Sequence, residues 1–218
     1  WRALNKISQI TREEMNAIGG QEIFLSALQP KANWVQSGRW DTMDILFKIK
    51  YQGDAWYALG PTHEEVVVPL AARQIASYRD LPKYVYQIQT KFRDELRAKS
   101  GLLRGREFLM KDLYSFHAKE GDLKAYYEQV KIAYVRIFTR CGLSAIITEA
   151  AGGSFTKNYS HEFQVLTENG EDVIYHCACG WAQNKEISRA RGGDKCPRCG
   201  RAVKESKAIE VGNIFDLG

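Results

Sequence analysis

Two stretches of the chain repeat apolar residues every three to four positions. They cover residues 7–18 and 123–141, and a glycine follows each of them. This spacing places the apolar side chains on one face of an α-helix, and glycine is common directly after a helix. We therefore expect two amphipathic helices. Cys141 belongs to the apolar face of the second helix, so we expect a small core thiol there rather than a nucleophile.

A pattern of period two begins at residue 84. Side chains over residues 84–95 alternate in direction as in a β-strand, and residues 106–117 read as a second strand. Residues 97–105 between them contain glycine and basic side chains. This order predicts a long antiparallel hairpin with a positively charged loop. Shorter strands are expected at residues 22–25, within residues 34–51, and at residues 145–149, 161–167, 172–176 and 208–215.

A third helix is expected to begin near residue 62. Thr62 and Glu65 have the spacing of a capping box, in which side chains satisfy the first backbone N–H groups of a helix. Pro69 lacks an N–H group and crowds the preceding turn, so we expect it to disturb this helix. The capping box leaves His63 and Glu64 for other roles, and a carboxylate such as Glu64 could bind an ammonium group.

Length and composition exclude several classes of protein. The chain has 218 residues, of which 44% are hydrophobic and 26% are charged, so it can bury a core and is not intrinsically disordered. Its 18 glycines and 5 prolines exclude a collagen-like chain. We find no apolar run of the roughly 18 residues that a membrane span needs and no signal-peptide pattern. We therefore expect a cytoplasmic protein without a membrane contact.

Basic residues gather in two places. Residues 83–111 hold eight bases against three acids, and residues 176–207 again hold eight against three. Because the whole chain carries a net charge of +5, the rest of the molecule must be acidic, with a net charge of −5. Two basic segments on an acidic body suggest contact with a polyanion at two places. A solvated surface would give the same pattern, and for residues 176–207 taken alone it is the preferred interpretation.

Four of the five cysteines lie within residues 177–199. In a chain without a secretory signal this clustering favours a metal site over disulfides. Cys196 and Cys199 form a Cys-Pro-Arg-Cys-Gly knuckle of the kind that binds Zn²⁺, with Cys179 as the third ligand. The fourth ligand is Cys177 or His176, since His176 and Cys179 have the usual two-residue gap. Four free thiols without a metal are the alternative.

The predicted hairpin carries a set of residues suited to a nucleotide. A strand would place Arg93 and Glu95 on one face, where the guanidinium can bind a phosphate and the carboxylate can accept from the amine of adenine. Arg104 and Arg106 could hold the far phosphates, and Phe108 offers a ring against which a base could stack. By itself the Arg93 and Glu95 pair is a weak signal, and a surface salt bridge is then the better interpretation.

Several longer motifs point to one family. Residues 90–95 and 104–117 closely resemble the second signature motif of bacterial-type prolyl-tRNA synthetases, and Gly-Pro-Thr-His-Glu-Glu at residues 60–65 resembles a loop of the same family. The same family pattern continues at residues 37–40, 152–154, 160–163 and 209–215. The resemblance covers nearly the whole chain, with the motifs in the family's order.

The resemblance implies a class II synthetase fold of class α+β, with an antiparallel sheet flanked by helices. It implies that proline is activated with ATP and Mg²⁺ to prolyl-adenylate and is then transferred to tRNA(Pro). On this resemblance Arg93 and Glu95 are the catalytic residues. The ATP-binding set is Arg93, Glu95, Arg104, Arg106 and Phe108, and the proline-binding set is Thr62, Glu64, Arg93, Glu162 and Phe215, with His161 next to Glu162 bordering the site.

Compared with the family that it resembles, the chain also shows departures. We expect a catalytic core over residues 1–172, a zinc-ribbon-like insert over residues 173–207 in place of an editing domain, and a return strand over residues 208–218. The third class II motif and the anticodon-binding domain are expected beyond residue 218, and the full-length protein is expected to be a homodimer. The chain alone is therefore expected to be inactive in pyrophosphate exchange. The alternative is a non-catalytic paralogue that binds RNA or protein through the basic hairpin and the zinc module.

Overall fold

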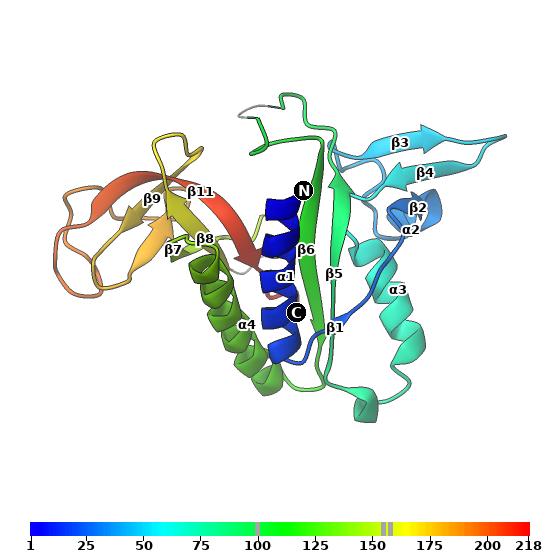
Figure 1. Ribbon diagram of the computed structural model, residues 1–218, viewed down its shortest axis with the longest axis horizontal. Helices are drawn as coiled ribbons and strands as arrows, with labels where there is room; N and C mark the ends of the chain where they lie inside the picture. The colour runs from blue at the N-terminus through cyan, green and yellow to red at the C-terminus, as the bar shows by residue number, and fades with distance from the viewer. Residues whose placement is uncertain (99–100, 154–155, 157–158) are drawn as a thin grey trace. The chain divides into compact units, whose positions relative to one another are not determined.

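The computed structural model describes residues 1–98, 101–153, 156 and 159–218, and of Tyr159 only the backbone. The chain divides into two compact units, Trp1–Tyr126 and Tyr127–Gly218 (Figure 1). Within the described residues, no helix has both the length and the apolar character that a membrane crossing requires.

The described part of the first unit contains three α-helices, one short 3₁₀ helix, six strands and the start of a fourth α-helix. The helices are α1 (Arg2–Ala17), α2 (Lys31–Gln36), α3 (Glu64–Gln74), η1 (Tyr78–Asp80) and α4 (Glu120–Arg140), the last of which continues into the second unit. The strands are β1 (Gln21–Glu22), β2 (Leu28–Pro30), β3 (Phe47–Lys50), β4 (Trp56–Leu59), β5 (Lys83–Phe92) and β6 (Glu107–Phe116).

Strands β5 and β6 form the predicted hairpin. They pair antiparallel from Lys83 with Phe116 to Phe92 with Glu107, and β1 adds a parallel edge to β5 (Figure 1). The polar side chains on one face of β5 are buried: Gln87, Gln89 and Lys91 are 0%, 6% and 0% exposed. A polar strand face inside the protein must find partners there, which makes this face the basis of the candidate site.

Helix α1 confirms the first predicted helix and packs against the sheet of β5. Its buried Met15 lies next to Gly20, where an added Cβ would lie 2.9 Å from the Met15 backbone oxygen and 3.0 Å from the Tyr86 ring. Only glycine fits so close an approach. The Tyr86 hydroxyl then donates to Asn16 at the end of the helix, at 2.7 Å.

Strands β2, β4 and β3 form a second small sheet, in that order. The strand expected within residues 34–51 is β3. The start of that stretch differs, because Trp34 lies in helix α2. Pro30 ends β2 and directly precedes the helix, with an extended conformation of φ −65° and ψ 139°. Its missing N–H costs no helical hydrogen bond at this position. Trp34 is buried with Trp40, Leu46 and Ala58 in a core of their own.

Helix α3 starts differently from the prediction. The capping box is wrong, because the residue before the helix is His63 and no side chain caps the helix start. Pro69 lies inside the helix, which nevertheless continues to Gln74. The carbonyl of Glu65 would normally accept from residue 69, which has no N–H; the Asn33 side-chain amide donates to it instead, at 3.0 Å.

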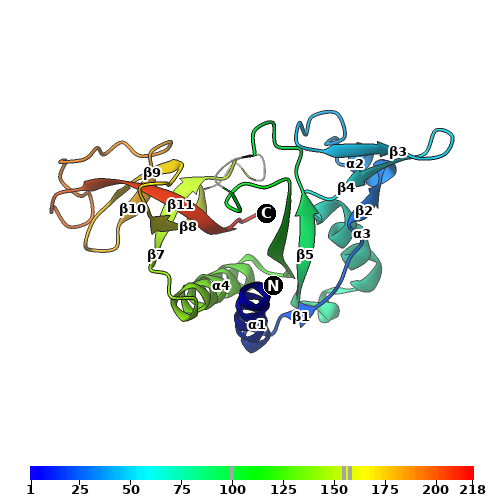
Figure 2. The same ribbon diagram turned by 45° about the horizontal axis from the view of Figure 1, so that its top comes forward.

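The described strands of the second unit form a five-stranded barrel with the order β10-β7-β8-β11-β9 (Figure 2). Its strands are β7 (Ala145–Ala151), β8 (Tyr159–Leu166), β9 (Asp172–His176), β10 (Ala182–Asn184) and β11 (Lys204–Ile214). The sequence pattern predicted all of these except β10, which is only three residues long. The expected insert, residues 173–207, begins in β9 and ends in β11, so both of its ends belong to the barrel.

Candidate active site and candidate metal centre

The carboxylate of Glu64, the first residue of α3, is held by three side chains from different parts of the first unit. The Thr62 hydroxyl and the Tyr114 hydroxyl on β6 donate to it, the latter at 3.1 Å, and Arg39 lies 3.5 Å away. The Glu64 side chain remains 23% exposed. It is therefore a fixed, partly accessible negative charge at the start of a helix.

Glu65, the next residue, is turned inward and supports Arg39. Its carboxylate accepts from Arg39 at 2.9 Å and from the Ser37 hydroxyl at 3.0 Å, and its side chain is 1% exposed. Arg39 therefore joins both acids of the loop and stays in place beside Glu64. Arg39 lies within residues 37–40, one of the segments that resemble the synthetase pattern, so this segment supplies the cation that orders the acidic pair.

A buried network of charged and polar groups supports the loop of residues 60–65. The Lys91 ammonium group is 2.8 Å from the Asp112 carboxylate and 2.6 Å from His63 Nδ1. His63 Nε2 lies 3.2 Å from the backbone oxygen of Ser26, and the Gln87 amide donates to Asp112 at 2.9 Å. Lys91 and His63 are both 0% exposed. This arrangement requires a neutral His63 that accepts from Lys91 at Nδ1 and donates from Nε2.

Burial dominates the electrostatics of this network. Burial, followed by the positive charge of Lys91, lowers the pKa of His63 to about 4. Burial also lowers the pKa of Lys91, while Asp112 opposes that shift. Burial raises the pKa of Tyr114, with a further contribution from the charge of Glu64, so its hydroxyl remains a donor to that carboxylate. His63 is therefore neutral and the Tyr114 hydroxyl protonated near neutral pH.

The backbone of residues 60–62 is tied to both sheets. Gly60 donates to the Ala27 backbone oxygen at 2.8 Å, and its own oxygen accepts from the Phe92 N–H at 3.1 Å. The Gln29 amide donates to the Thr62 backbone oxygen at 3.0 Å and would lie 2.3 Å from a Cβ added to Gly60. A side chain at residue 60 would displace Gln29, so the loop needs glycine for close packing.

Arg93 and Glu95 do not share a strand face, and this part of the prediction is wrong. Strand β5 ends at Phe92, and the Glu95 N–H donates to the Arg93 oxygen at 2.8 Å, which closes a three-residue turn. The N–H of Asp94 donates instead to the Ile45 oxygen at 2.9 Å. The contact with the segment before β3 bends the chain away from the extended path that the alternating pattern predicted.

The turn still brings together the residues of the predicted ATP-binding set. The Arg93 guanidinium lies 5.3 Å from the centre of the Phe108 ring. Arg104 is 4.0 Å from the Glu95 carboxylate, and Arg106 donates to the Glu95 backbone oxygen at 2.9 Å. The side chains of Glu95 and Arg104 are 20% and 48% exposed. Three arginines and one carboxylate therefore lie along the end of the hairpin.

In the second unit, Glu162 of β8 is 8% exposed and accepts from the amides of Gln164 at 2.8 Å and Asn184 at 3.1 Å. Burial raises the pKa of Glu162, and the two amides oppose this shift. His161 Nδ1 lies 2.9 Å from the Tyr127 hydroxyl. Phe215, directly after β11, is partly buried. Of the Gly-Gly-Ser motif, Ser154 lies outside the described residues.

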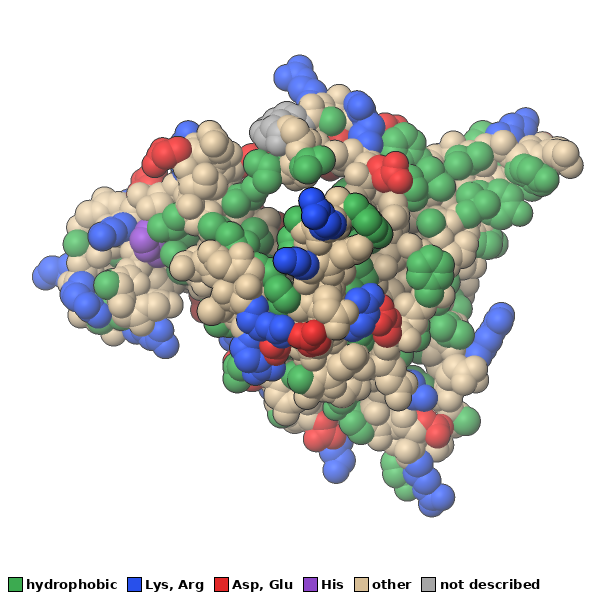
Figure 3. All heavy atoms as spheres, viewed as in Figure 1, with side chains coloured by type: hydrophobic (Ala, Val, Ile, Leu, Met, Phe, Trp, Pro, Cys, Tyr) green, Lys and Arg blue, Asp and Glu red, His purple; other side chains and the backbone are tan. Residues whose placement is uncertain are grey.

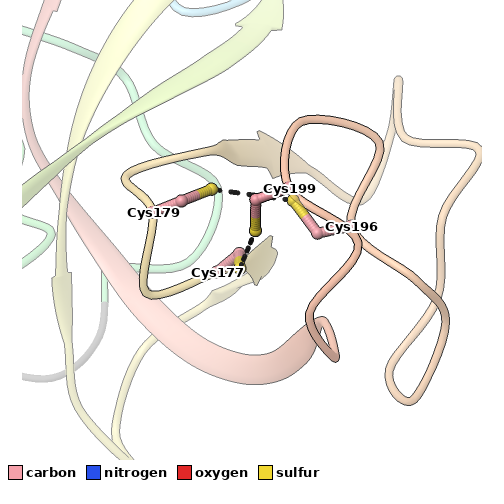
Figure 4. Close-up of side chains that lie close together, drawn as sticks. All are labelled: Cys177, Cys179, Cys196 and Cys199. Carbon is pink, nitrogen blue, oxygen red and sulfur yellow. Dashed lines mark hydrogen bonds between the residues drawn. The ribbon is translucent and has the colours of Figure 1, made fainter.

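Four cysteines in the second unit form one cluster (Figure 4). Cys177 and Cys179 come from the loop between β9 and β10, and Cys196 and Cys199 from a loop before β11. All four sulfurs lie within 4.8 Å of one another, with Cys177 and Cys199 at 3.5 Å and Cys179 and Cys196 at 3.7 Å. Tetrahedral Zn²⁺ with Zn–S bonds of about 2.3 Å needs sulfurs about 3.8 Å apart, so the cluster fits zinc.

His176, the alternative fourth ligand, points elsewhere. Its Nε2 atom lies 3.0 Å from the Ser206 hydroxyl on β11. The group of possible ligands among the described residues contains the four cysteines and not His176. The geometry therefore favours Cys177, and the unusual Cys-Ala-Cys spacing is accommodated because the loop turns at Gly180, whose φ is +86°.

Residues 47–218 match the family described as the tRNA synthetase class II core domain (G, H, P, S and T). The chain belongs to this family. It is 48% identical over 206 residues to proline–tRNA ligase 1 of Anaeromyxobacter dehalogenans, covering 94% of this chain and 36% of that protein. It is 45% identical to the proline–tRNA ligase of Acaryochloris marina, covering 100% of this chain and 37% of that protein. The chain thus spans about a third of the length of these relatives.

The fold also resembles solved structures. The prolyl-tRNA synthetase of Giardia lamblia, solved in complex with prolyl-adenylate, superposes with a TM-score of 0.70 at 19% identity, covering 94% of this chain and 44% of that one. The predicted α+β class II synthetase fold is thereby confirmed.

Within this synthetase core, the sequence alone missed the buried support of the candidate site. The sequence pattern gives His63 no partner and does not indicate Lys91, Asp112 and Tyr114 as part of the site. The sequence contains part of the signal for the role of Lys91, because Gln87, Gln89 and Lys91 alternate on one side of β5. Only the fold shows that this side faces inward.

Proposed function

We propose that this class II synthetase core is the proline- and ATP-binding part of a proline–tRNA ligase. The observation that carries the proposal is the fixed Glu64 carboxylate, held by Thr62 and Tyr114 while remaining partly exposed. Such a group suits the secondary ammonium group of proline, since an ion pair with a preorganised partner costs little reordering. The names of the curated relatives support the same function.

Each predicted residue has a proposed role. Thr62 and Glu64 hold the proline nitrogen, and Arg93 contacts the proline carboxylate and the ATP α-phosphate. Glu95 accepts from the adenine amine, Phe108 packs against the base, and Arg104 or Arg106 holds the γ-phosphate. The proline-binding set is completed by Glu162 and Phe215.

The loop that carries Thr62 and Glu64 is positioned by the buried network of Lys91, His63 and Asp112.

The proposed reaction is the activation of proline. A carboxylate oxygen of proline forms a bond to the α-phosphorus, the bond from that phosphorus to the β-phosphate bridge breaks, and pyrophosphate leaves with the electron pair. Mg²⁺ accompanies ATP, and the prolyl group then passes to tRNA(Pro). Arg93 contributes by holding the two reactants together and balancing charge at the α-phosphate. We propose that the full-length protein acts in the cytoplasm as a homodimer.

The test is binding of a sulfamoyl analogue of prolyl-adenylate to the 218-residue chain. At a hundredfold excess over Kd we expect the melting temperature to rise by roughly 5–10 °C. E64Q is expected to abolish the rise, whereas E168Q, which changes an exposed acid in a turn of the second unit, should retain it. An equal rise with the alanyl analogue, or a full rise in E64Q, would contradict the proposed proline site.

We also propose that Cys177, Cys179, Cys196 and Cys199 hold one structural Zn²⁺. Four thiolates complete a tetrahedral site and leave no position for a substrate, so the metal would stabilise the loops between β9 and β11. Atomic absorption should find one zinc per chain. C199S should lose it, and C141S should keep it because Cys141 lies outside the cluster. H176Q is expected to keep the metal; loss in that variant would restore His176 as the fourth ligand.

A further inference from the structure

The segment that carries the cysteine cluster, residues 176–207, is named here the cysteine module. It holds eight bases and three acids. Figure 3 shows several Lys and Arg side chains and few acidic ones over this part of the second unit, at the left of the view. All eight bases are exposed: Lys185, Arg189, Arg191, Lys195, Arg198, Arg201, Lys204 and Lys207. Zinc with four thiolates would carry −2, so a loaded module with a protein charge of +5 would remain positive.

Within the described part of the chain, none of these eight bases forms an ion pair with a carboxylate. Two acids of the module are engaged by backbone groups instead. Asp194 accepts from the Arg191 backbone N–H at 2.7 Å, and Glu186 accepts from the Ala151 N–H at 2.9 Å. In the first unit, by contrast, Arg12, Arg39 and Lys91 each have a carboxylate partner. Arg201 interacts instead with the Cys199 sulfur. The other bases of the module therefore add positive charge to its surface that no described carboxylate pairs with.

A hollow of about 600 Å³ opens in the same surface. Trp181, Ile187 and Pro197 give it apolar lining, and Arg189 and Lys195 add two cations. Its lining also contains one acid, Asp194, which accepts from the Arg191 backbone N–H. Trp181 packs against the small core of the module and remains partly accessible. Such a hollow is within the size range of sites for small organic groups, which is about 300–1,000 Å³.

We propose that this surface of the cysteine module binds a single-stranded segment of RNA, with a base against Trp181 and phosphates at Arg189 and Lys195. An aromatic ring beside two cations that form no ion pair with a described carboxylate suits the two parts of a nucleotide, because bases stack on aromatic rings and phosphates bind cations. The inference rests on the proposed function in that a tRNA ligase must bind RNA. An acidic protein would need the cations but not the ring.

The test is fluorescence anisotropy of a labelled single-stranded RNA of about 12 nucleotides, within the usual site sizes, with the full chain. R189Q/K195Q should weaken binding at least tenfold and reduce the slope of log K against log salt by about 1.4, since two phosphate contacts are lost. The control R2Q/K6Q removes two exposed charges from α1 and should bind as the unaltered chain does. W181L should weaken binding roughly five- to hundredfold, and W181F should retain most of it.

Four results would overturn the inference: no binding of RNA, equal losses in both double variants, no effect of W181L in a chain with unchanged melting temperature, or tighter binding of a polyglutamate of equal length. Each preparation is also titrated with the prolyl-adenylate analogue. Analogue binding without RNA binding rejects the RNA surface and leaves the proposed ligase site standing. RNA binding that depends on Trp181 and Arg189, without analogue binding, supports the surface and rejects the ligase site.

Discussion

At the scale of single residues, the main feature is a lysine buried completely inside the first unit. Lys91 is stable there because Asp112 supplies a negative charge and His63 an acceptor, both within 2.8 Å. A buried ion pair contributes little net stability compared with apolar residues, but loss of one partner leaves an uncompensated charge. The network is therefore sensitive to single substitutions and tolerant of paired ones.

We predict that K91M lowers the free energy of unfolding by about 3–5 kcal/mol, because Asp112 would remain buried without its cation. The matched control is K124M, which removes an exposed lysine paired with Glu120 on α4 and should cost at most about 0.5 kcal/mol. Urea unfolding measures both. If K91M/D112L is no more stable than K91M, the cost does not come from the unpaired carboxylate and the interpretation is wrong.

A second prediction concerns pH. The pKa of His63 is about 4 in the fold and near 6.5 when the chain is unfolded, so between these values the unfolded chain binds a proton that the folded chain does not. The free energy of unfolding should therefore fall as the pH drops, by about 2.5 kcal/mol between pH 7.5 and 4.5 from this residue. H63Q should show a correspondingly smaller fall in urea unfolding. An identical fall in H63Q would exclude His63 as its source.

At the scale of elements, the hairpin and α1 follow directly from the sequence pattern, whereas α2 and α3 depend on each other. Helix α3 continues through an internal proline because the Asn33 side chain of α2 donates to the Glu65 carbonyl. The proline has no N–H group that could donate to it. An unpaired buried carbonyl would cost free energy, so a residue 32 positions before that carbonyl makes the helix possible. No local pattern around Pro69 indicates this partner.

We predict that N33A costs about 1–2 kcal/mol of stability, because the Glu65 carbonyl loses its donor. In the P69A background the same change should cost less than about 0.5 kcal/mol, since the alanine introduced there supplies the helical N–H. Thermal and urea unfolding of the unaltered chain, N33A, P69A and N33A/P69A measure this double-mutant cycle. Q36A, at an exposed position of α2, serves as the control and should change little. Equal costs of N33A in both backgrounds would mean that Asn33 does not replace the missing bond.

At the scale of the whole molecule, each unit has its own buried clusters, and the cysteine cluster belongs to the second. Tyr175, Cys177, Cys196 and Val203 share a small buried core, so the proposed metal and the apolar packing of the cysteine loops support each other. A core this small is too little to order long loops unaided, and metal binding supplies the missing folding free energy in such modules.

We predict that a zinc chelator affects the two units differently. Amide hydrogen exchange should accelerate in β9 and β10, which flank the Cys177 loop, and remain slow in β5 and β6. Mass spectrometry of peptides from both regions provides the measurement, with the C199S chain as the reference for metal loss. Equal acceleration in both units would mean that the metal supports the fold as a whole, and no change would mean that the loops do not need it.

The sequence by itself determined the hairpin, the amphipathic helices, the cysteine cluster and the family, because these depend on local periodicity, short spacings and long motifs. The tertiary structure alone decided that Gln87, Gln89 and Lys91 face inward, that Arg93 and Glu95 lie in a turn, and that Asn33 sustains α3. These outcomes depend on partners distant in the chain, such as Ile45 for the turn and Asp112 for Lys91. Local patterns describe the shape of a segment, whereas burial is set by whatever packs against it.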